Sequence, residues 1–415
     1  MRIITHELKK IWSVKILVII TALCALYFFA VMNSEIKNYP KDDLFLNIDF
    51  AHRLTETYGV TLSQNDFEDF LKNEEIIIFE LNTFIASNSF FTGLGIFNYD
   101  DYMDFRMDYE SRFDMLDDEE RNLVYSLFLE WGGIVRTITG ENLISDKVAP
   151  EAYAKLVSFG NIVGMYQTNI IGHDEWLSTI DSFIEYTPLN EREIQRLIEI
   201  RDSGELISIM DFHTISHTWR YARSLAVLII LVTLIMVSPL VTTDRANRVN
   251  WLQYSSKQGR GILKKQFFAV LLSAVGMTTI LVLIFAGLFS VTTEVHAFWN
   301  NGINSFLSGT FHWLSITFGQ YVLLMIVTMY LLSVGTAAFA FVLSQCSNNM
   351  IRLIFKVIPF FIAVFIVSNW ILNDFLVIFI GGNVFLQMLS LLVTLIVGVV
   401  TAILVVCREK RVELI

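Results

Sequence analysis

The sequence predicts an all-α polytopic membrane protein, with six transmembrane helices and a large, mostly helical extracytoplasmic domain between the first and second spans. Three observations support this fold class. The chain of 415 residues is 54% hydrophobic and only 17% charged, whereas soluble domains carry about 25% charged residues. Six apolar runs are long enough to cross ~30 Å of hydrocarbon as helices, the form that satisfies every backbone group in lipid. Acidic and basic residues are also segregated along the chain.

This segregation separates an acidic block from a basic frame. Residues 33–220 hold 35 of the 41 acids but only 14 of the 30 Lys and Arg, a net charge of −21. The other positions carry 6 acids and 16 basic residues, a net of +10. The three Cys all lie in or beside apolar runs, so we expect no disulfides in the acidic block. With nearly 190 residues, the acidic block is long enough to build a hydrophobic core without disulfides.

The apolar runs set the segment boundaries that we expect. The six spans are residues 16–32, 224–241, 267–291, 316–343, 353–372 and 385–406. Basic residues precede the first span, follow the sixth, and lie between the second and third and between the fourth and fifth. The positive-inside rule makes these segments cytoplasmic. We therefore expect a plasma-membrane protein with both termini, including the tail 407–415, in the cytoplasm and residues 33–223 outside.

Residues 1–15 precede the first span and predict a helix on the inner membrane surface. In MRIITHELKKIW an apolar face holds Ile3, Ile4, Leu8, Ile11 and Trp12, while Glu7, Lys9 and Lys10 lie elsewhere. This is the layout of an interfacial helix; a disordered basic start to the first span is the alternative. No small-residue cleavage site follows the first run, so we expect an uncleaved span rather than a signal peptide.

Two further stretches have less certain structures. In the acidic block we expect helices over residues 117–138 and 190–200, the second capped by Asn190, while residues 75–79 are ambiguous between helix and strand. Residues 373–384, NDFLVIFIGGNV, are apolar but too short to cross the membrane. They predict a re-entrant or interfacial hairpin broken at Gly381 and Gly382, or an extension of a neighbouring span.

The chain carries no recognisable catalytic motif. Nothing matches the phosphate-binding pattern G-x-x-x-x-G-K-[ST], so we expect no nucleotide hydrolysis by this chain alone. His213 and His217 would share a helix face near Asp211, but no third metal ligand is evident, and polar residues near lipid headgroups are the alternative. The acidic run of residues 99–120 lacks the glycine of an EF-hand loop, and a solvated acidic face is favoured over a cation site. We expect no catalytic residue and no metal site.

Residues 242–266 combine a basic rim with large apolar residues, which a simple connector does not need. Residues 243–265 read TDRANRVNWLQYSSKQGRGILKK, with six basic residues and one acid. The series is similar to the first cytoplasmic loop of ABC-2 type permeases, the membrane subunits of a broad class of ABC transporters. It departs from that pattern in lacking the proline after the serine turn and in having Trp251 for a common Leu. The residues assigned to ATPase coupling are Asp244, Arg245, Trp251, Leu252, Tyr254, Ser255, Lys257, Arg260 and Lys264.

The resemblance extends to the order of segments along the whole chain. It implies a permease subunit that couples ATP hydrolysis by a separate cytosolic ABC ATPase, the holder of ATP and Mg²⁺, to export. The absence of charged groups in the spans and the large acidic outer block suggest an amphipathic cargo, such as a peptide, antibiotic or lipid. The resemblance also implies pairing with a second permease, identical or homologous. Trp251, Leu252 and Tyr254 would anchor the loop in the ATPase. Arg245, Lys257 and Arg260 would pair with its acids or with lipid phosphates.

Alternative functions remain open at this point. The loop could be a positively charged segment that only fixes orientation. The complex could use ATP to signal or to transmit force through its outer domain without transport, or the chain could be a membrane-anchored sensor with no ATPase. The near absence of ionisable residues in the spans argues against a proton or ion relay. Expected partners are the ATPase, a second permease and membrane lipids, not nucleic acid.

Overall fold

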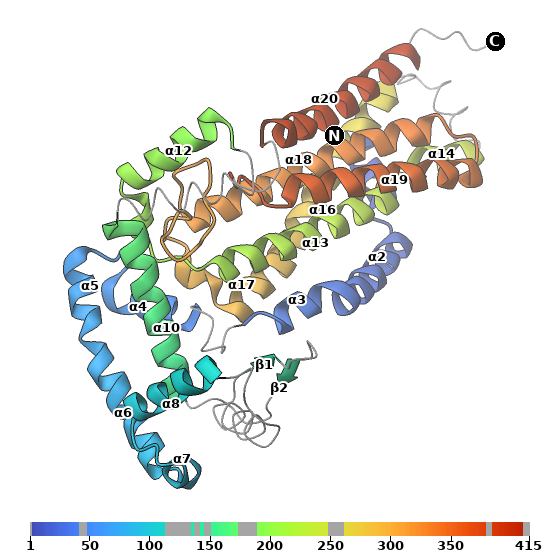
Figure 1. Ribbon diagram of the computed structural model, residues 1–415. Helices are drawn as coiled ribbons and strands as arrows, with labels where there is room; N and C mark the ends of the chain where they lie inside the picture. Colours follow the sequence, from blue (N-terminus) through green and yellow to red (C-terminus); the bar gives the residue numbers. More distant parts are fainter. Residues whose placement is uncertain are drawn as a thin grey trace.

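The computed structural model describes residues 2–40, 48–112, 134–136, 142–144, 151–172, 189–247, 261–378 and 384–409. Within these ranges the chain is almost entirely helical (Figure 1). The one sheet among the described residues pairs β1 (Ile134–Arg136) with β2 (Asn142–Ile144) antiparallel, with Val135 opposite Leu143. The predicted fold class is confirmed.

Six helical stretches among the described residues are long and apolar enough to cross a membrane. The chain is therefore a multi-pass membrane protein. The first stretch comprises α2 (Val14–Tyr27), η1 (Phe28–Met32) and α3 (Asn33–Lys37), and the second α13 (Phe212–Val237) and α14 (Pro239–Ala246). The third comprises α16 (Ile262–Leu281), η6 (Val282–Ala286) and α17 (Gly287–Thr293). The last three are α18 (Phe318–Gln345), α19 (Met350–Leu372) and α20 (Val384–Glu409).

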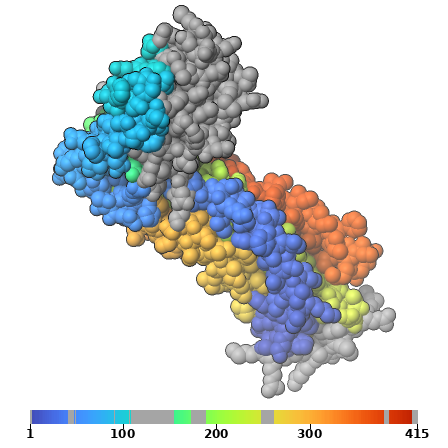
Figure 2. Space-filling model, turned by 90° about the horizontal axis from the view of Figure 1, so that it is seen from below, coloured from blue at the N-terminus to red at the C-terminus, as the bar shows by residue number. Residues whose placement is uncertain are grey.

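The second stretch is the central helix of the bundle. In its most apolar part 83% of the residues are buried within the protein, against 6% in the first stretch, which runs along the bundle surface (Figure 2). α13 begins at Phe212 rather than near residue 224, because the Asp211 carboxylate accepts hydrogen bonds from the backbone N–H groups of His213 and Thr214. Such a cap satisfies donors that the first helical turn leaves free.

α18 and α20 cross with almost no space between their backbones. A Cβ atom added to Gly398 would lie 2.8 Å from the carbonyl oxygen of Gly335 and 3.0 Å from the ring of Phe339. A Cβ atom added to Gly335 would lie 3.3 Å from backbone atoms of Thr394 and Leu395. Small residues let membrane helices approach closely, and tight packing is what holds helices together where lipid is as apolar as their side chains.

A helical lobe lies beside one end of the bundle (Figure 1). Its described helices are α4 (Ile48–Tyr58), α5 (Gln64–Leu71), α6 (Asn73–Ser87), α7 (Ser89–Gly93), α8 (Tyr99–Arg112), α10 (Glu151–Tyr166) with η3 (Gln167–Ile171), α12 (Glu191–Asp202) and η4 (Glu205–Ile207). Aromatic rings join α5 to α10, with Phe67 stacked on Tyr166 at 4.0 Å between centroids.

Three local predictions for the lobe can be compared with this structure. Asn190 caps α12 in a reciprocal capping box with Glu193, which confirms the cap. The ambiguous residues 75–79 lie within α6 and are helical. The helix predicted over residues 117–138 is wrong at residues 134–136, which form β1. Two glycines precede β1 in the sequence and disfavour helix, and the β-branched Ile134 and Val135 favour strand; residues 117–133 and 137–138 lie outside the described residues.

Glu205 connects the lobe to the segment between α17 and α18 through hydrogen bonds. Its carboxylate accepts hydrogen bonds from the Arg196 guanidinium at 3.0 Å, from Asn304 Nδ2 at 2.6 Å and from Ser315 Oγ at 2.6 Å. Nearby, η7 (Val295–Phe298) leads to Asn301, whose Nδ2 donates to Thr55 Oγ1 in the lobe at 3.1 Å. The lobe and the bundle are thus joined by directional contacts as well as by apolar packing.

These contacts predict a stability change in acid. Burial would raise the pKa of Glu205, but the hydrogen bonds from Ser315 and Asn304 and the charge of Arg196 outweigh it and hold the pKa below 4.5. A lowered folded-state pKa contributes stability above pH 4.5 that is lost as the pH falls through the folded-state value. In Glu205→Gln we expect unfolding to cost about 2 kcal/mol less at pH 7, with the difference shrinking below about pH 4.5. Thermal unfolding from pH 7 to 3 measures it; a pH-independent difference would contradict the assignment.

Residues 373–378 form a turn between α19 and α20 rather than a continuation of α19. The N–H of Trp313 donates to the carbonyl of Leu376 at 3.1 Å, and the N–H of Ile378 donates to that of Phe311 at 2.8 Å. Phe375 and Val377 are buried there. The break predicted at Gly381 and Gly382 lies outside the described residues.

Candidate functional site at the basic end of the bundle

The N-terminal helix packs across the third span at the end of the bundle opposite the lobe. We name this end of the bundle the basic end. α1 (Arg2–Ile11) buries Ile11 completely. Just beyond it, Trp12 Nε1 donates to Ser273 Oγ of α16 at 3.1 Å. The residues of the predicted apolar face pack against the core of the bundle. The helix expected at the start of the chain is therefore present, and it is held by specific contacts with the spans.

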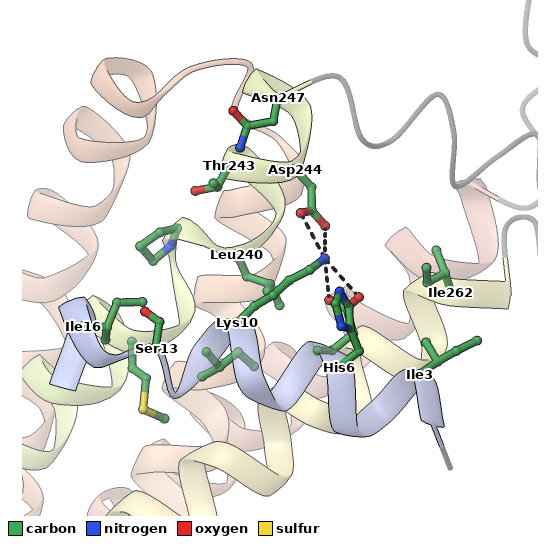
Figure 3. A pocket seen from close by; sticks show the side chains of 14 residues that line it. Ile3, His6, Lys10, Ser13, Ile16, Leu240, Thr243, Asp244, Asn247 and Ile262 are labelled. Atoms are coloured by element: carbon green, nitrogen blue, oxygen red, sulfur yellow. Dashed lines mark hydrogen bonds and ion pairs between the residues drawn. The ribbon is translucent and has the colours of Figure 1, made fainter.

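A buried polar cluster, named the polar junction, joins α1, α14 and α16. It consists of Glu7, Lys10, Asp244 and Gln266. Figure 3 labels Lys10 and Asp244, which point toward each other. Lys10 Nζ lies 3.1 Å from Glu7 Oε1 and 3.0 Å from Asp244 Oδ2. Gln266 Nε2 donates to Glu7 Oε2 at 3.1 Å and to Asp244 Oδ2 at 3.0 Å. The side chain of Lys10 is 26% exposed, whereas Glu7, Asp244 and Gln266 are buried.

The position of Glu7 differs from the sequence-based prediction. We expected it away from the apolar face of the first helix, but Glu7 is only 1% exposed. Because the carboxylate meets an ammonium group and a carboxamide donor, its burial is compensated by hydrogen bonds. The burial of Glu7 is thus explained by one partner on the same helix, Lys10, and one far away in the sequence, Gln266.

Lys10 holds the two carboxylates together. Burial would lower the pKa of Lys10, but the hydrogen bond and charge of Asp244, followed by those of Glu7, outweigh it and raise the pKa above 10.5. The ammonium group therefore stays charged at neutral pH. Gln266 adds two donors without adding charge, as its NH₂ group allows. Removing the cation would leave two buried carboxylates facing each other.

Arg245 ties the end of α14 to the end of α18. Its guanidinium donates to the backbone carbonyl and to Oε1 of Gln345. One turn earlier, Ser344 Oγ accepts hydrogen bonds from the N–H groups of Val241 and Thr242 at 3.2 Å each. Asp244 and Arg245, adjacent in the sequence, thus hold different helices: Asp244 contacts α1 and α16, and Arg245 contacts α18.

A cavity of about 690 Å³ lies between α1 and α14 (Figure 3). Lys10, Glu7 and Asp244 form its polar wall, and Ile3 and Leu240 are among the apolar residues that line the rest. Thr243 and Asn247 also line it, so the cavity lies beside the point where the predicted coupling loop begins.

The predicted coupling residues fall into three groups. Asp244 and Arg245 belong to the contacts just described. Lys264 lies in the first turn of α16 with an exposed side chain, outside the polar junction. The remaining six lie outside the described residues, in the segment 248–260: Trp251, Leu252, Tyr254, Ser255, Lys257 and Arg260.

Sequence reasoning missed Glu7, Lys10 and Gln266 as site residues. A weak signal was present, because Glu7 and Lys10 are three residues apart and can pair on one helix. Nothing in the sequence joins them to Asp244, which lies 234 residues after Lys10.

The described residues contain no group of three or more His, Cys, Asp or Glu that could hold a metal ion. His217 Nδ1 lies 3.8 Å from Glu35 Oε2, and Asp211 is engaged in capping α13. At the basic end, a few buried polar contacts join four helices, α1, α14, α16 and α18.

No protein-family model, curated protein or solved structure matches this chain.

Proposed function

We propose that this protein is the permease subunit of an ABC exporter and that residues 248–260 dock onto a separate cytosolic ATPase. One observation carries the proposal. The residues that open the loop are fixed to the spans by specific contacts, Asp244 to α1 and α16, and Arg245 to α18. A loop that served only to connect two spans would need no such anchoring.

Both ends of the loop are also fixed to each other. The described residues on either side of the segment 248–260 are Asn247, three residues beyond Asp244, and Gly261, five residues before Gln266. Gln266 and Asp244 are hydrogen-bonded at 3.0 Å. A displacement of the loop would therefore move α14 and α16 together, and Lys10 would carry α1 with them. Movements of packed helices as units are the usual way in which such a signal spreads.

The composition of the loop suits a protein partner. In the sequence, Arg248, Lys257 and Arg260 flank Trp251 and Leu252, and interfaces commonly place aromatic anchors within a polar rim. Basic residues on this loop also favour its cytoplasmic location, where an ATPase would find its nucleotide. The ATPase supplies ATP hydrolysis, and the chain described here supplies the membrane path and the connection to it.

The cargo that fits best is amphipathic. The spans carry few ionisable side chains, so a highly charged solute would find few partners within them. Apolar residues on the first span (α2 and η1) and on α19 are exposed, among them Leu26, Phe29, Phe355 and Ile366. A second permease would cover part of this surface. Either an identical or a homologous chain would serve as this second permease.

A second candidate, transmission of force to the lobe without transport, is favoured by the firm connection between lobe and bundle. Tyr39, which follows α3, is hydrogen-bonded to Thr214 of α13 at 3.1 Å, and Glu205 and Asn301 add the contacts described above. Movement of α13 would therefore reach the lobe.

Flux measurements separate the two candidates. In proteoliposomes that contain the chain and its ATPase, we expect ATP-dependent movement of a fluorescent amphipathic peptide, reduced at least ten-fold by Trp251→Ala combined with Arg260→Glu. Arg352→Glu is the matched charge control, because Arg352 is exposed on α19 and is not among the residues assigned to coupling. ATP hydrolysis that moves the lobe but transports no amphipathic peptide or lipid would exclude the exporter and support force transmission.

A further inference from the structure

An apolar groove lies between α13, the third span and α18, in the half of the bundle nearer the lobe. Its volume is about 340 Å³, and none of the described residues that line it is charged. Leu225, Phe289 and Met325 on its floor are buried, whereas Leu283 and Val291 at its edges are 71% and 72% exposed. The groove therefore opens on a surface of the bundle that faces hydrocarbon.

A widened helical turn shapes this groove. Residues Val282–Ala286 form the π-helical element η6 between α16 and α17. The hydroxyl of Tyr221 on α13 donates to the carbonyl of Phe285 at 2.8 Å, and its ring stacks on Phe289 at 4.3 Å between centroids. Single π-turns inside α-helices are rare and occur frequently at functional sites. Here a tertiary hydrogen bond holds the turn against α13.

The groove is about as long, along the third span, as one leaflet of a bilayer is thick. Along the third span it extends from Val282 to Val291, roughly 13 Å at 1.5 Å per residue, against about 15 Å for half of the hydrocarbon thickness. Trp299 lines the end nearer the lobe, and its carbonyl accepts a hydrogen bond from the N–H of Gly319 at 2.9 Å. Tryptophan is enriched where hydrocarbon meets headgroups, so this end suits the interface and the other end the membrane interior.

We propose that the groove binds one acyl chain of a bilayer phospholipid from the leaflet nearer the lobe. The chain would lie along Phe289 and Met325 and leave its headgroup beside Trp299. A volume of 340 Å³ holds roughly eleven groups of about 30 Å³, the volume of a water molecule in the liquid, which fits most of a single alkyl chain. A helix from a partner, at about 10 Å across, is too large for it. This site does not depend on the ATPase or on transport.

Photo-crosslinking of the full chain in phosphatidylcholine vesicles tests the site. The probe is a phosphatidylcholine with a diazirine near the end of one acyl chain, and labelled peptides are identified by mass spectrometry. We expect labelling of the peptide 282–299 at least five-fold above that of α19, although Phe355 and Ile366 of α19 are 75% and 61% exposed. Labelling in proportion to exposure in the unsubstituted protein would overturn the proposal, whatever any variant does.

Gly287→Phe fills the groove and provides the second arm. A Cβ atom on Gly287 meets no heavy atom within 4 Å, so the ring can enter the cavity without moving the backbone. We expect labelling of 282–299 to fall at least five-fold, while labelling of α19 stays the same. Leu272→Phe, at a position on α16 that is 47% exposed and does not line the groove, should leave both signals unchanged. Undiminished labelling of 282–299 in Gly287→Phe would contradict an acyl chain bound in the groove.

Discussion

Lys10→Glu is expected to lower the free energy of unfolding by at least about 3 kcal/mol, the cost of breaking a buried ion pair by removing one partner. The substitution places a third carboxylate beside Glu7 and Asp244, which Lys10 now holds at 3.1 and 3.0 Å. Only the carboxamide of Gln266 would remain as a donor to them within the polar junction. Unfolding in detergent micelles, followed by helical circular dichroism, measures the loss.

Two companion variants show whether the loss comes from this ion pair. Lys9→Glu makes the same chemical change at the neighbouring position, which is exposed, and we expect it to alter stability by no more than about 0.5 kcal/mol. Adding Asp244→Lys to Lys10→Glu restores a cation between two carboxylates and should recover at least half of the lost stability. If the double variant is as unstable as the sum of the single variants, Lys10 and Asp244 are not coupled and the polar junction is wrongly described.

Gly398→Leu is expected to cost about 3 kcal/mol or more, at the upper end of the usual range for overpacking. The first added carbon would lie 2.8 Å from the carbonyl oxygen of Gly335, and a backbone atom in the middle of a span cannot move aside alone. α20 would have to shift away from α18 along the crossing. The midpoint of thermal unfolding in detergent measures the effect.

Gly287→Leu is the matched control for this glycine. Gly287 also lies in a membrane-spanning helix, but its added carbon meets no atom within 4 Å. We expect it to keep or slightly raise the stability, because leucine favours helix over glycine. Equal losses in Gly398→Leu and Gly287→Leu would show that glycine matters for backbone conformation at both sites, and would contradict the close crossing of α18 and α20.

The spans and their order could be predicted from the sequence because lipid imposes one simple requirement. A spanning helix must be long and apolar, and hydropathy detects that property directly. The start of α13 was harder to place, because His213, Thr214 and Ser216 interrupt the apolar pattern although they belong to the helix. Asp211 caps that helix end, and Thr214 is paired with Tyr39. The cap is local, to residues two and three positions later, whereas the pairing of Thr214 with Tyr39 spans 175 residues and requires the folded structure.

The polar junction could not be predicted for a similar reason. Gln266 and Glu7 are 259 residues apart in the sequence and are hydrogen-bonded at 3.1 Å. The periodicity of a helix is analysed one segment at a time, so a polar residue such as Glu7 is assigned to the face of its helix that meets water. Arg245 was predicted as a contact for the ATPase or lipid phosphates, and in the structure it binds the end of α18. Asp244, chosen from the order of residues in the loop, is the one predicted site residue in the polar junction.

The central claim, that this chain works through a separate ATPase docked on residues 248–260, is tested most directly by purifying the complex from native membranes. The full chain, carrying an affinity tag, should retain an ATPase subunit with a phosphate-binding loop in near-equal amount, and the purified complex should hydrolyse ATP. Trp251→Ala combined with Arg260→Glu should lower the amount of that subunit recovered with the chain at least ten-fold, whereas Arg352→Glu, at an exposed position on α19 outside the coupling residues, should leave the amount unchanged. Recovery of the intact chain with no ATPase subunit and no ATP hydrolysis would contradict the account.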